Sequence, residues 1–353
     1  MKNKVIKFGL LGLGRVVKNR VANVFLNELC SSKVSVVYDK IKIKKNSYEK
    51  IFNCKSTNYQ NNFFKEKVDY IYVATDSGSH YKCVLKCFSY NQNVIVEKPP
   101  TLKVQDLIRL NKLAKKKKLE FYVIFQNRLN KSVQYIKKNI KSIKKEKIIF
   151  LTLDLLWSRD QAYYNDWHGK WRTDGGVLAQ QGIHYIDLLC YFLGKPIKCI
   201  SFISKKSNKL QAEDTHCAII IFKDNISCTV NMTTALRPKD VEASIKIFTQ
   251  KKIYKLKGLC CNNLEIQDNF DSNRNYNAIN KSYSQKVPTG YGLSHKEVFQ
   301  NIINFRLKKT KKRPLSAIES IDTLRLINML YKSFENQRWV YYSEGIPNSR
   351  LGN

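Results

Sequence analysis

Short apolar runs alternate with amphipathic helical patterns along the first 126 residues. Helical spacing covers 16–29, directly after the first apolar run, and again covers 104–117. The runs have the length and the β-branched content of buried strands, and they lie at 5–11, 34–38, 68–74, 93–97 and 121–125. Strands that alternate with helices in this way predict a doubly wound parallel sheet, an α/β arrangement, over residues 1–126.

After residue 126 the pattern changes to consecutive strands. Apolar stretches follow one another on short turns, at 197–203, 215–222, 226–232, 243–248 and 253–256. Lys223-Asp224-Asn225, between two of these stretches, is typical of a hairpin turn. Consecutive strands on short turns predict a mainly antiparallel sheet, so we expect a second, α+β domain over 127–353.

Helices and loops complete the second domain. Helical patterns cover 132–144, 178–193, 295–307 and 318–337, and a long strand is expected over 148–157. Two segments lack periodicity and are expected to be loops, an aromatic one over 160–174 and a polar, Asn-rich one over 266–289. An open antiparallel sheet with one face not covered by its own helices would favour a homodimer or homotetramer through that face.

Basic residues greatly outnumber acidic ones, 63 to 28, which gives a formal net charge of +35. Such a balance raises the question of a nucleic-acid or anionic membrane partner. The lysine runs at 115–118 and 137–147 fall inside helical patterns, however, and no nucleic-acid motif accompanies them. No run of about 18 apolar residues occurs, and the start of the chain is not that of a signal peptide. We therefore expect a cytoplasmic protein with no nucleic-acid and no membrane partner, whose excess charge attracts at most a small anionic substrate.

The ten cysteines include no C-x-x-C pair. In a chain of 353 residues this spacing indicates neither a disulfide scaffold nor a zinc ribbon. Reduced thiols and no metal site are expected.

A glycine turn lies between the first strand and the first helix. Gly12 and Gly14 fit the first two glycines of the dinucleotide fingerprint, in which the backbone approaches a pyrophosphate at a helix N-terminus. Val17 stands where that fingerprint has its third glycine. Asp39 ends the second strand, where a carboxylate accepts hydrogen bonds from the adenosine ribose and disfavours a 2′-phosphate. The pattern predicts NAD as the cofactor, with Lys40 leaving NADP open.

Two further segments carry candidate chemistry. Glu97-Lys98-Pro99 ends a strand at the edge where such sheets bind ligands, and proline there can fix a cis peptide. In the helix that follows Gly175 and Gly176, one face holds Gln180, His184 and Asp187. A histidine on a polar helix face suits acid–base work on a hydroxyl, but it is equally compatible with a satisfied, partly buried histidine.

Four motifs together resemble the Gfo/Idh/MocA oxidoreductases. They are Gly12-x-Gly14, Thr75-x-Ser77-Gly78-x-His80, Glu97-Lys98-Pro99 and Gly182-Ile183-His184-Tyr185-Ile186-Asp187, in the family's order and spacing. The resemblance covers nearly the whole chain. It implies an N-terminal Rossmann domain and NAD(P)-dependent oxidation of a sugar or cyclitol hydroxyl. It also implies a cofactor-binding set, namely Gly12, Gly14, Arg15, Val16, Asp39, Thr75, Ser77, His80, Glu97 and Lys98.

Within the family, the chain is most similar to UDP-N-acetylglucosaminuronate 3-dehydrogenase-type enzymes of polysaccharide precursor synthesis. The likeness rests on residues 157–164, 181–184 and 237–240. It implies that His184 takes a proton from a ring hydroxyl while Lys98 holds the oxygen. It also implies a set of substrate-binding residues: Lys98, Tyr163, Trp171, Arg172, Gln180, Gln181, His184, Arg237 and Lys239. The loop members Tyr163, Trp171, Arg172, Arg237 and Lys239 are alternatively solvated loop residues, and Lys98 is alternatively an ordinary surface lysine.

Two positions depart from the family pattern. Gln180 stands where many members have an acidic residue four before the histidine, and Asp76 replaces a usual proline. Three alternatives therefore stay open: a dehydrogenase of a free sugar or inositol, a dinucleotide-binding regulator without catalysis, and a basic nucleic-acid-binding protein.

Overall fold

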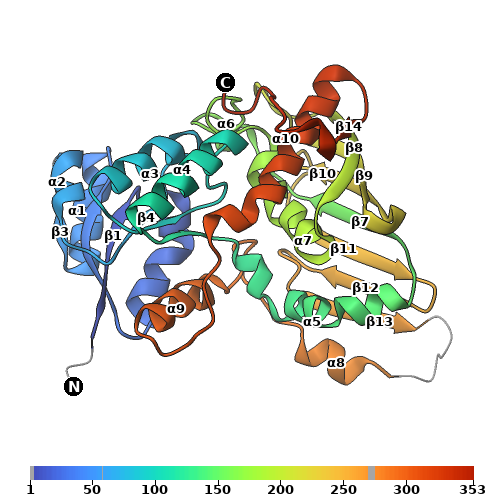
Figure 1. The fold of residues 1–353 in the computed structure, drawn as a ribbon, viewed down its shortest axis with the longest axis horizontal. Coiled ribbons are helices and arrows are strands. Elements are labelled where there is room, and N and C mark those ends of the chain that lie inside the picture. The colour runs from blue at the N-terminus through green and yellow to red at the C-terminus, as the bar shows by residue number, and fades with distance from the viewer. Residues whose placement is uncertain (1–3, 58, 269–274) are drawn as a thin grey trace. The chain divides into compact units, whose positions relative to one another are not determined.

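The computed structural model describes residues 4–57, 59–268 and 275–353, without the side chains of 43–45. The chain divides into two compact units (Figure 1). The first consists of Met1–Gln126 and Ser294–Ile321, and the second of Asn127–Leu293 and Asp322–Asn353.

A six-stranded parallel sheet forms the centre of the first unit. Its strand order is β3-β2-β1-β4-β5-β6, with every neighbouring pair parallel. The strands are β1 (Ile6–Leu11), β2 (Ser32–Tyr38), β3 (Lys55–Ser56), β4 (Tyr70–Val73), β5 (Val94–Val96) and β6 (Phe121–Val123). The apolar runs are buried on both faces of this sheet, as expected for parallel strands covered by helices.

Helical segments connect these strands, namely η1 (Val17–Val21), η2 (Val24–Glu28), α1 (Lys42–Phe52), α2 (Gln60–Lys65), η3 (Ser77–Ser79), α3 (His80–Ser89) and α4 (Val104–Lys117). After β6, η4 (Gln126–Leu129) leads into the second unit, and α9 (His295–Arg306) and η7 (Ala317–Ser320) return to the first. The pattern over 16–29 predicts one regular helix, whereas η1 and η2 are π-helical turns. Val17, Val21, Val24 and Phe25 are buried in either winding, so the apolar spacing does not distinguish them.

Helix α9 packs in the first unit although it follows the strands of the second in sequence. Phe299, Ile302 and Ile303 belong to the apolar core of β1 and β4. The ring centroid of Phe299 lies 5.3 Å from that of Tyr72 and 4.9 Å from that of Phe25. The expected second domain over 127–353 therefore loses 294–321 to the first unit, because an apolar helix face does not reveal against which sheet it packs.

The second unit contains an eight-stranded sheet in the order β13-β12-β11-β7-β10-β9-β8-β14. Its neighbours are antiparallel except β7 and β10, which pair parallel. The strands are β7 (Ile148–Leu156), β8 (Pro196–Ser204), β9 (Thr215–Phe222), β10 (Ser227–Thr233), β11 (Glu242–Thr249), β12 (Lys252–Lys257), β13 (Asn263–Asp268) and β14 (Val340–Tyr341). The predicted hairpin turn joins β9 to β10, with positive φ at Asp224 and Asn225.

The helical segments of the second unit are α5 (Lys131–Lys145), α6 (Gln161–Tyr164), η5 (Leu178–Gly182), α7 (Ile183–Leu193), η6 (Lys223–Asn225), α8 (Asn277–Ser282), α10 (Ile321–Asn336) and η8 (Tyr342–Glu344). The expected loop over 266–289 is wrong where β13 ends and where α8 lies, and the loop over 160–174 contains α6. Elements of one or two turns have too little apolar periodicity to be recognised from the sequence. Residues 269–274 of the expected loop lie outside the residues that the structure describes.

The two faces of this sheet differ. Leu151, Leu153 and Leu155 of β7 point to the buried face, where α10 meets β8 and η5 meets β10. On the opposite face Phe202 is 69 % exposed, and Phe150 and Ile219 are also exposed. This opposite face therefore presents exposed apolar side chains to solvent in a single chain, next to polar ones such as Asp154 and Lys246.

Candidate active site

The glycine turn follows β1. Gly12 has φ +90°, and a Cβ there would lie 2.7 Å from the main chain of Ala74. A Cβ on Gly14 would meet no protein atom within 4 Å. Arg15 is exposed and Val16 half-buried where the helical segment begins. The turn thus leaves open space beside a helix start, the arrangement that suits a phosphate.

Asp39 directly follows β2. Its Oδ2 accepts the Leu13 N–H at 2.8 Å, and its Oδ1 accepts the Ile41 N–H at 2.8 Å. The carboxylate therefore fixes the glycine turn from the neighbouring strand end. Its half-buried position at the strand end also suits it to a ribose hydroxyl.

Asp76 has a defined role as a helix cap. Its Oδ1 accepts the Ser79 N–H at 3.0 Å at the start of η3, where Ser77 is buried. An aspartate in place of the usual proline is therefore satisfied as an N-cap. Thr75 precedes it and follows the end of β4.

His80 links the Thr75 loop to the Lys98–Pro99 turn. Its Nδ1 lies 2.7 Å from the main-chain oxygen of Pro99, and its Nε2 lies 3.2 Å from that of Thr75. Burial lowers the pKa of His80, which keeps the ring neutral. A neutral ring has one N–H, so the shorter contact assigns the donor to Nδ1. His80 thereby holds the two loops together.

Glu97 supports the same turn from inside the sheet. It is buried; its Oε1 accepts the Tyr72 hydroxyl at 2.6 Å and its Oε2 accepts the Lys98 N–H at 3.2 Å. Burial raises the pKa of this carboxyl, against the effect of both hydrogen bonds and of the Lys98 charge. The Lys98–Pro99 peptide is cis, and Lys98 is half-buried.

These features share one edge of the first unit. The glycine turn, Asp39, Thr75 and Glu97 follow β1, β2, β4 and β5, and carboxyl ends of parallel strands meet at the same edge. The space over Gly14, the helix start and the carboxylate fit a dinucleotide such as NAD. Among the described residues no group of three or more His, Cys, Asp or Glu side chains is placed to hold a metal.

In the second unit, two separate loops join around an ion pair. The Arg159 guanidinium lies 2.8 Å from Asp240 Oδ1, which also accepts the Ser158 N–H at 2.8 Å. Main-chain bonds from Trp157 and Arg159 to the loop after β10 complete the junction. The stretches 157–164 and 237–240, 73 or more positions apart in sequence, are neighbours in the fold.

Tyr163 joins the first of these loops to the glutamine pair. Its hydroxyl accepts the Gln181 Nε2–H at 3.1 Å, and its ring centroid lies 4.2 Å from that of His168. Gln181 is only 6 % exposed, and its Oε1 contacts no donor among the described residues. Burial raises the pKa of Tyr163, so its hydroxyl stays protonated and can donate.

His184 lies in the first turn of α7 and is half-buried, close in sequence to the buried Gln180. Asp187 was expected on the same helix face. Its carboxylate is instead held by the Arg128 guanidinium, with both contacts at 2.7 Å, and by the Thr323 hydroxyl at 2.8 Å. Asp187 therefore anchors the helix, which helical spacing alone does not distinguish from a role beside His184.

The remaining candidates lie at the surface of the second unit. Lys239 and Arg172 are exposed. The Arg237 guanidinium donates to the main-chain oxygens of Thr234 and Leu236 and to Asn208 Oδ1, at 3.3, 2.7 and 3.2 Å. These bonds hold the Arg237 side chain against the protein. The sequence does not indicate these hydrogen-bond partners.

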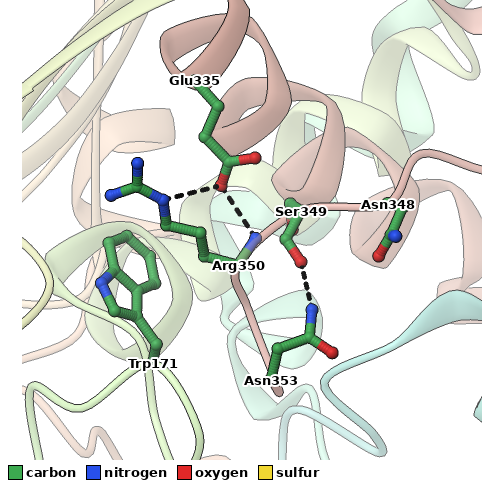
Figure 2. Close-up of a pocket in the computed structure, with 6 residues that line it drawn as sticks. All are labelled: Trp171, Glu335, Asn348, Ser349, Arg350 and Asn353. Carbon is green, nitrogen blue, oxygen red and sulfur yellow. Dashed lines mark hydrogen bonds and ion pairs between the residues drawn. The ribbon is translucent and has the colours of Figure 1, made fainter.

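Trp171 lines a pocket of about 390 Å³ with Glu335, residues 348–350 and Asn353 (Figure 2). Its main-chain oxygen accepts the Gly352 N–H at 2.8 Å, and its ring packs edge-on against Tyr331. Figure 2 shows the Glu335 carboxylate turned toward Arg350 and the indole beside them. Trp171 thus has a packing role in addition to its predicted contact with substrate.

Sequence reasoning missed Glu213 and Tyr331. Both are completely buried and hydrogen-bonded to each other at 2.9 Å next to the start of η5. Glu213 could have been noticed as an acidic residue directly before a predicted strand. Its partners Leu178 and Tyr331 are 35 and 118 positions away, so the sequence does not indicate them.

Comparison with known proteins identifies the family. Residues 6–125 match the family model "Oxidoreductase family, NAD-binding Rossmann fold", and 137–341 match "Oxidoreductase family, C-terminal alpha/beta domain". The chain is 28 % identical over 133 residues to the putative oxidoreductase YteT of Bacillus subtilis (36 % of this chain, 31 % of YteT). It is 23 % identical over 168 residues to myo-inositol 2-dehydrogenase of Thermotoga maritima (44 % and 47 %). The chain therefore spans less than half the length of these two curated relatives.

A solved structure covers nearly all of the chain. The WlbA dehydrogenase of Bordetella pertussis, in complex with NADH and UDP-GlcNAcA, has a TM-score of 0.88 at 23 % identity, covering 97 % of this chain and 99 % of WlbA. That likeness confirms the α/β fold. Because the two family models together match most of the sequence, the chain belongs to the Gfo/Idh/MocA oxidoreductases, and its first unit contains their NAD-binding Rossmann domain.

Proposed function

We propose that the protein uses NAD to oxidise a ring hydroxyl of a UDP-linked N-acetylhexosaminuronate at C3, in polysaccharide precursor synthesis. The observation that carries the proposal is the junction of three stretches in the second unit, at 157–164, 181–184 and 237–240. It gathers a tyrosine hydroxyl and a buried amide near His184, groups that suit a polar sugar ring. WlbA, whose fold this chain shares, was crystallised with NADH and UDP-GlcNAcA.

Each residue has a chemical task in this proposal. Bound NAD supplies the acceptor for the hydride that leaves the carbon bearing the hydroxyl. His184 removes the hydroxyl proton, so the products are a ketone, NADH and a proton held by the imidazole. Lys98 stabilises the developing charge on the oxygen. The His80 and Glu97 contacts fix the main chain of Lys98, while Tyr163 and Gln181 orient the sugar.

A free sugar or inositol is the second candidate substrate. The hydrogen bonds of Arg237 to Thr234, Leu236 and Asn208 favour it, because they use guanidinium N–H groups that would otherwise be available to a diphosphate. The match to myo-inositol 2-dehydrogenase points in the same direction. Loss of turnover when the nucleotide half is removed separates the two candidates.

Absorbance of reduced nicotinamide tests the proposal. Purified protein is mixed with NAD and, separately, with UDP-N-acetylglucosaminuronate, UDP-N-acetylglucosamine, free hexoses and inositols. We expect a rise with the nucleotide-linked acid. His184→Ala should lower kcat by about a hundredfold or more, the usual contribution of a general base, with little change in NAD affinity.

Lys223→Ala, in the exposed hairpin turn, is the matched control and should retain full activity. A rise with free sugars or inositols alone would show that the second candidate, a free sugar or inositol, is the substrate. NAD binding without turnover of any sugar would indicate a regulator that senses the cofactor.

We also propose that two copies associate through the open face of the second sheet, giving a homodimer or, by a further contact, a homotetramer. The face, defined by Phe150, Phe202, Ile219 and Phe248, includes the stacked pair Phe150 and Phe248 at 4.5 Å. Two of its charged side chains, Lys246 and Asp154, lie 4.0 Å apart and offset each other. Such pairing reduces the repulsion between two copies of a chain of net charge +35.

A further inference from the structure

The helical stretch that carries Gln181 and His184 begins without a cap of its own. Val177 occupies its N-cap position, and no side-chain hydrogen bond caps the helix there. The first N–H groups of a helix have no partners within it, so a buried helix start requires acceptors from elsewhere. Gly176, Val177 and Leu178 are all buried, so bulk water cannot accept hydrogen bonds from their N–H groups.

Glu213 supplies these acceptors from outside the helix. Its main-chain oxygen accepts the Val177 N–H at 3.0 Å, and its Oε1 accepts the Leu178 N–H at 3.1 Å. Tyr331 extends the cap, because its hydroxyl donates to Oε1 at 2.9 Å and accepts the Gly176 N–H at 3.2 Å. One glutamate and one tyrosine thus hold three consecutive N–H groups.

The glycine pair before the helix is explained by this cap. A Cβ on Gly176 would lie 2.2 Å from the main-chain oxygen of Glu213 and 2.4 Å from its Oε2. Gly175 has φ +79°, and a Cβ there would lie 3.0 Å from the Tyr331 hydroxyl. Both glycines are therefore needed for Glu213 and Tyr331 to reach the main chain.

The groups around the Glu213 carboxyl are acidic or neutral. Asp214 adjoins it in sequence, Tyr331 faces it from α10, and the Glu213 charge also acts on Tyr164 of α6. Asp174 acts on both tyrosines. Burial raises the pKa of Glu213 to about 8, against the effect of the Leu178 N–H and the Tyr331 hydroxyl, which favour the carboxylate. The carboxyl therefore changes charge in mildly alkaline solution.

We propose that Glu213 is a positioning residue for His184: it caps the helix that places His184, and the charge on its carboxyl sets the strength of that cap. The inference rests on the proposed role of His184 as the base. An ionised carboxylate accepts N–H groups more strongly and offsets the positive end of the helix dipole.

Glu213→Gln tests this proposal, because it keeps the acceptor for Leu178 and removes the charge. In the wild type, kcat should show a step near pH 8 in addition to that of His184. In the variant the step should be absent and kcat above it about fivefold lower, the fold-change of one charge at a helix end. KM should stay within about twofold, since sugar contacts are untouched.

Two further variants separate capping from general stability. Tyr331→Phe removes the relay to Gly176 but keeps the Leu178 bond, so it should lower kcat while preserving the step. Glu335→Gln removes another carboxylate of α10, which contacts Arg350 and not the helix start, and should leave the profile unchanged (Figure 2).

A measurement without substrate distinguishes failure of this inference from failure of the proposed function. The chain has five histidines, so the His184 imidazole signal can be assigned in an NMR spectrum by its loss in His184→Asn. The wild-type titration of His184 should show a second inflection that Glu213→Gln abolishes, whether or not any sugar is turned over. An identical titration in both proteins, or an equal loss of kcat at every pH, would overturn the proposal.

Discussion

Gly12 and Gly14 occupy one motif but answer different physical needs. Gly12 has a positive φ and sits against the main chain of Ala74, so its lack of a side chain is required by the fold itself. Gly14 faces space that no protein atom fills within 4 Å. We infer that its lack of a side chain serves the approach of a ligand.

Alanine substitutions at the two glycines should therefore affect different properties, stability at Gly12 and NAD affinity at Gly14. Gly12→Ala should lower the free energy of unfolding by about 2 kcal/mol, because it adds both strain at positive φ and a close contact. Gly14→Ala should leave the melting temperature within a degree or two of wild type and weaken NAD binding at least tenfold, since a methyl group would displace the phosphate. Calorimetry for unfolding and fluorescence titration for NAD measure the two effects; equal losses of stability in both variants would contradict this division.

At the residue scale, sequence reasoning located positions better than partners. The Lys98–Pro99 turn, Asp39 and His184 could all be named from motifs and strand ends. The hydrogen-bond partners of His80 and Arg237 could not be named, because they depend on how the loops fold back. The Leu178–Glu213 and Arg128–Asp187 contacts, 35 and 59 positions apart, are beyond what helical spacing can indicate.

At the scale of elements, long apolar patterns predicted helices and strands correctly, whereas short patterns did not predict the elements that they form. Helix α4 and strand β9 have the predicted bounds, because both keep one periodicity over their whole length. The short elements α6 and α8 were missed, and the π-helical winding of η1 and η2 has the same buried positions as a regular helix. Periodicity also leaves open which sheet an element covers, as α9 demonstrates.

Phe299 gives a test of where α9 belongs. It is fully buried, and its ring contacts Phe8, Phe25 and Tyr72 of the first unit. Phe299→Ala should lower the free energy of unfolding by about 4 kcal/mol through lost burial and the cavity left behind. Amide hydrogen exchange should accelerate in β1 and β4 and remain unchanged in β7 and β10.

Lys296→Ala, on the exposed side of the same helix, is the matched control and should leave exchange unaffected. Faster exchange confined to β7 and β10 in Phe299→Ala would show that α9 supports the other sheet.

At the scale of the whole molecule, charge and apolar surface have to be considered together. A net charge of +35 opposes self-association, while an open apolar sheet face promotes it. Among the described residues no helix combines the length and apolar character needed to span a lipid bilayer. The charge balance was available from composition, whereas the open face emerged only from the register of β7, β8, β9 and β10.

Association through the open face can be tested by placing a charge at its most exposed side chain. Phe202 is 69 % exposed, and Phe202→Lys would bring two cations together in a two-fold contact while removing apolar area. Light scattering should give an even multiple of the chain mass for the wild type and half of that mass for Phe202→Lys. Tyr59→Lys, at a 73 % exposed aromatic side chain of the first unit, adds the same charge elsewhere and should retain the wild-type mass. A monomeric wild type, or an unchanged mass in Phe202→Lys, would mean that this face is not where copies of the chain meet.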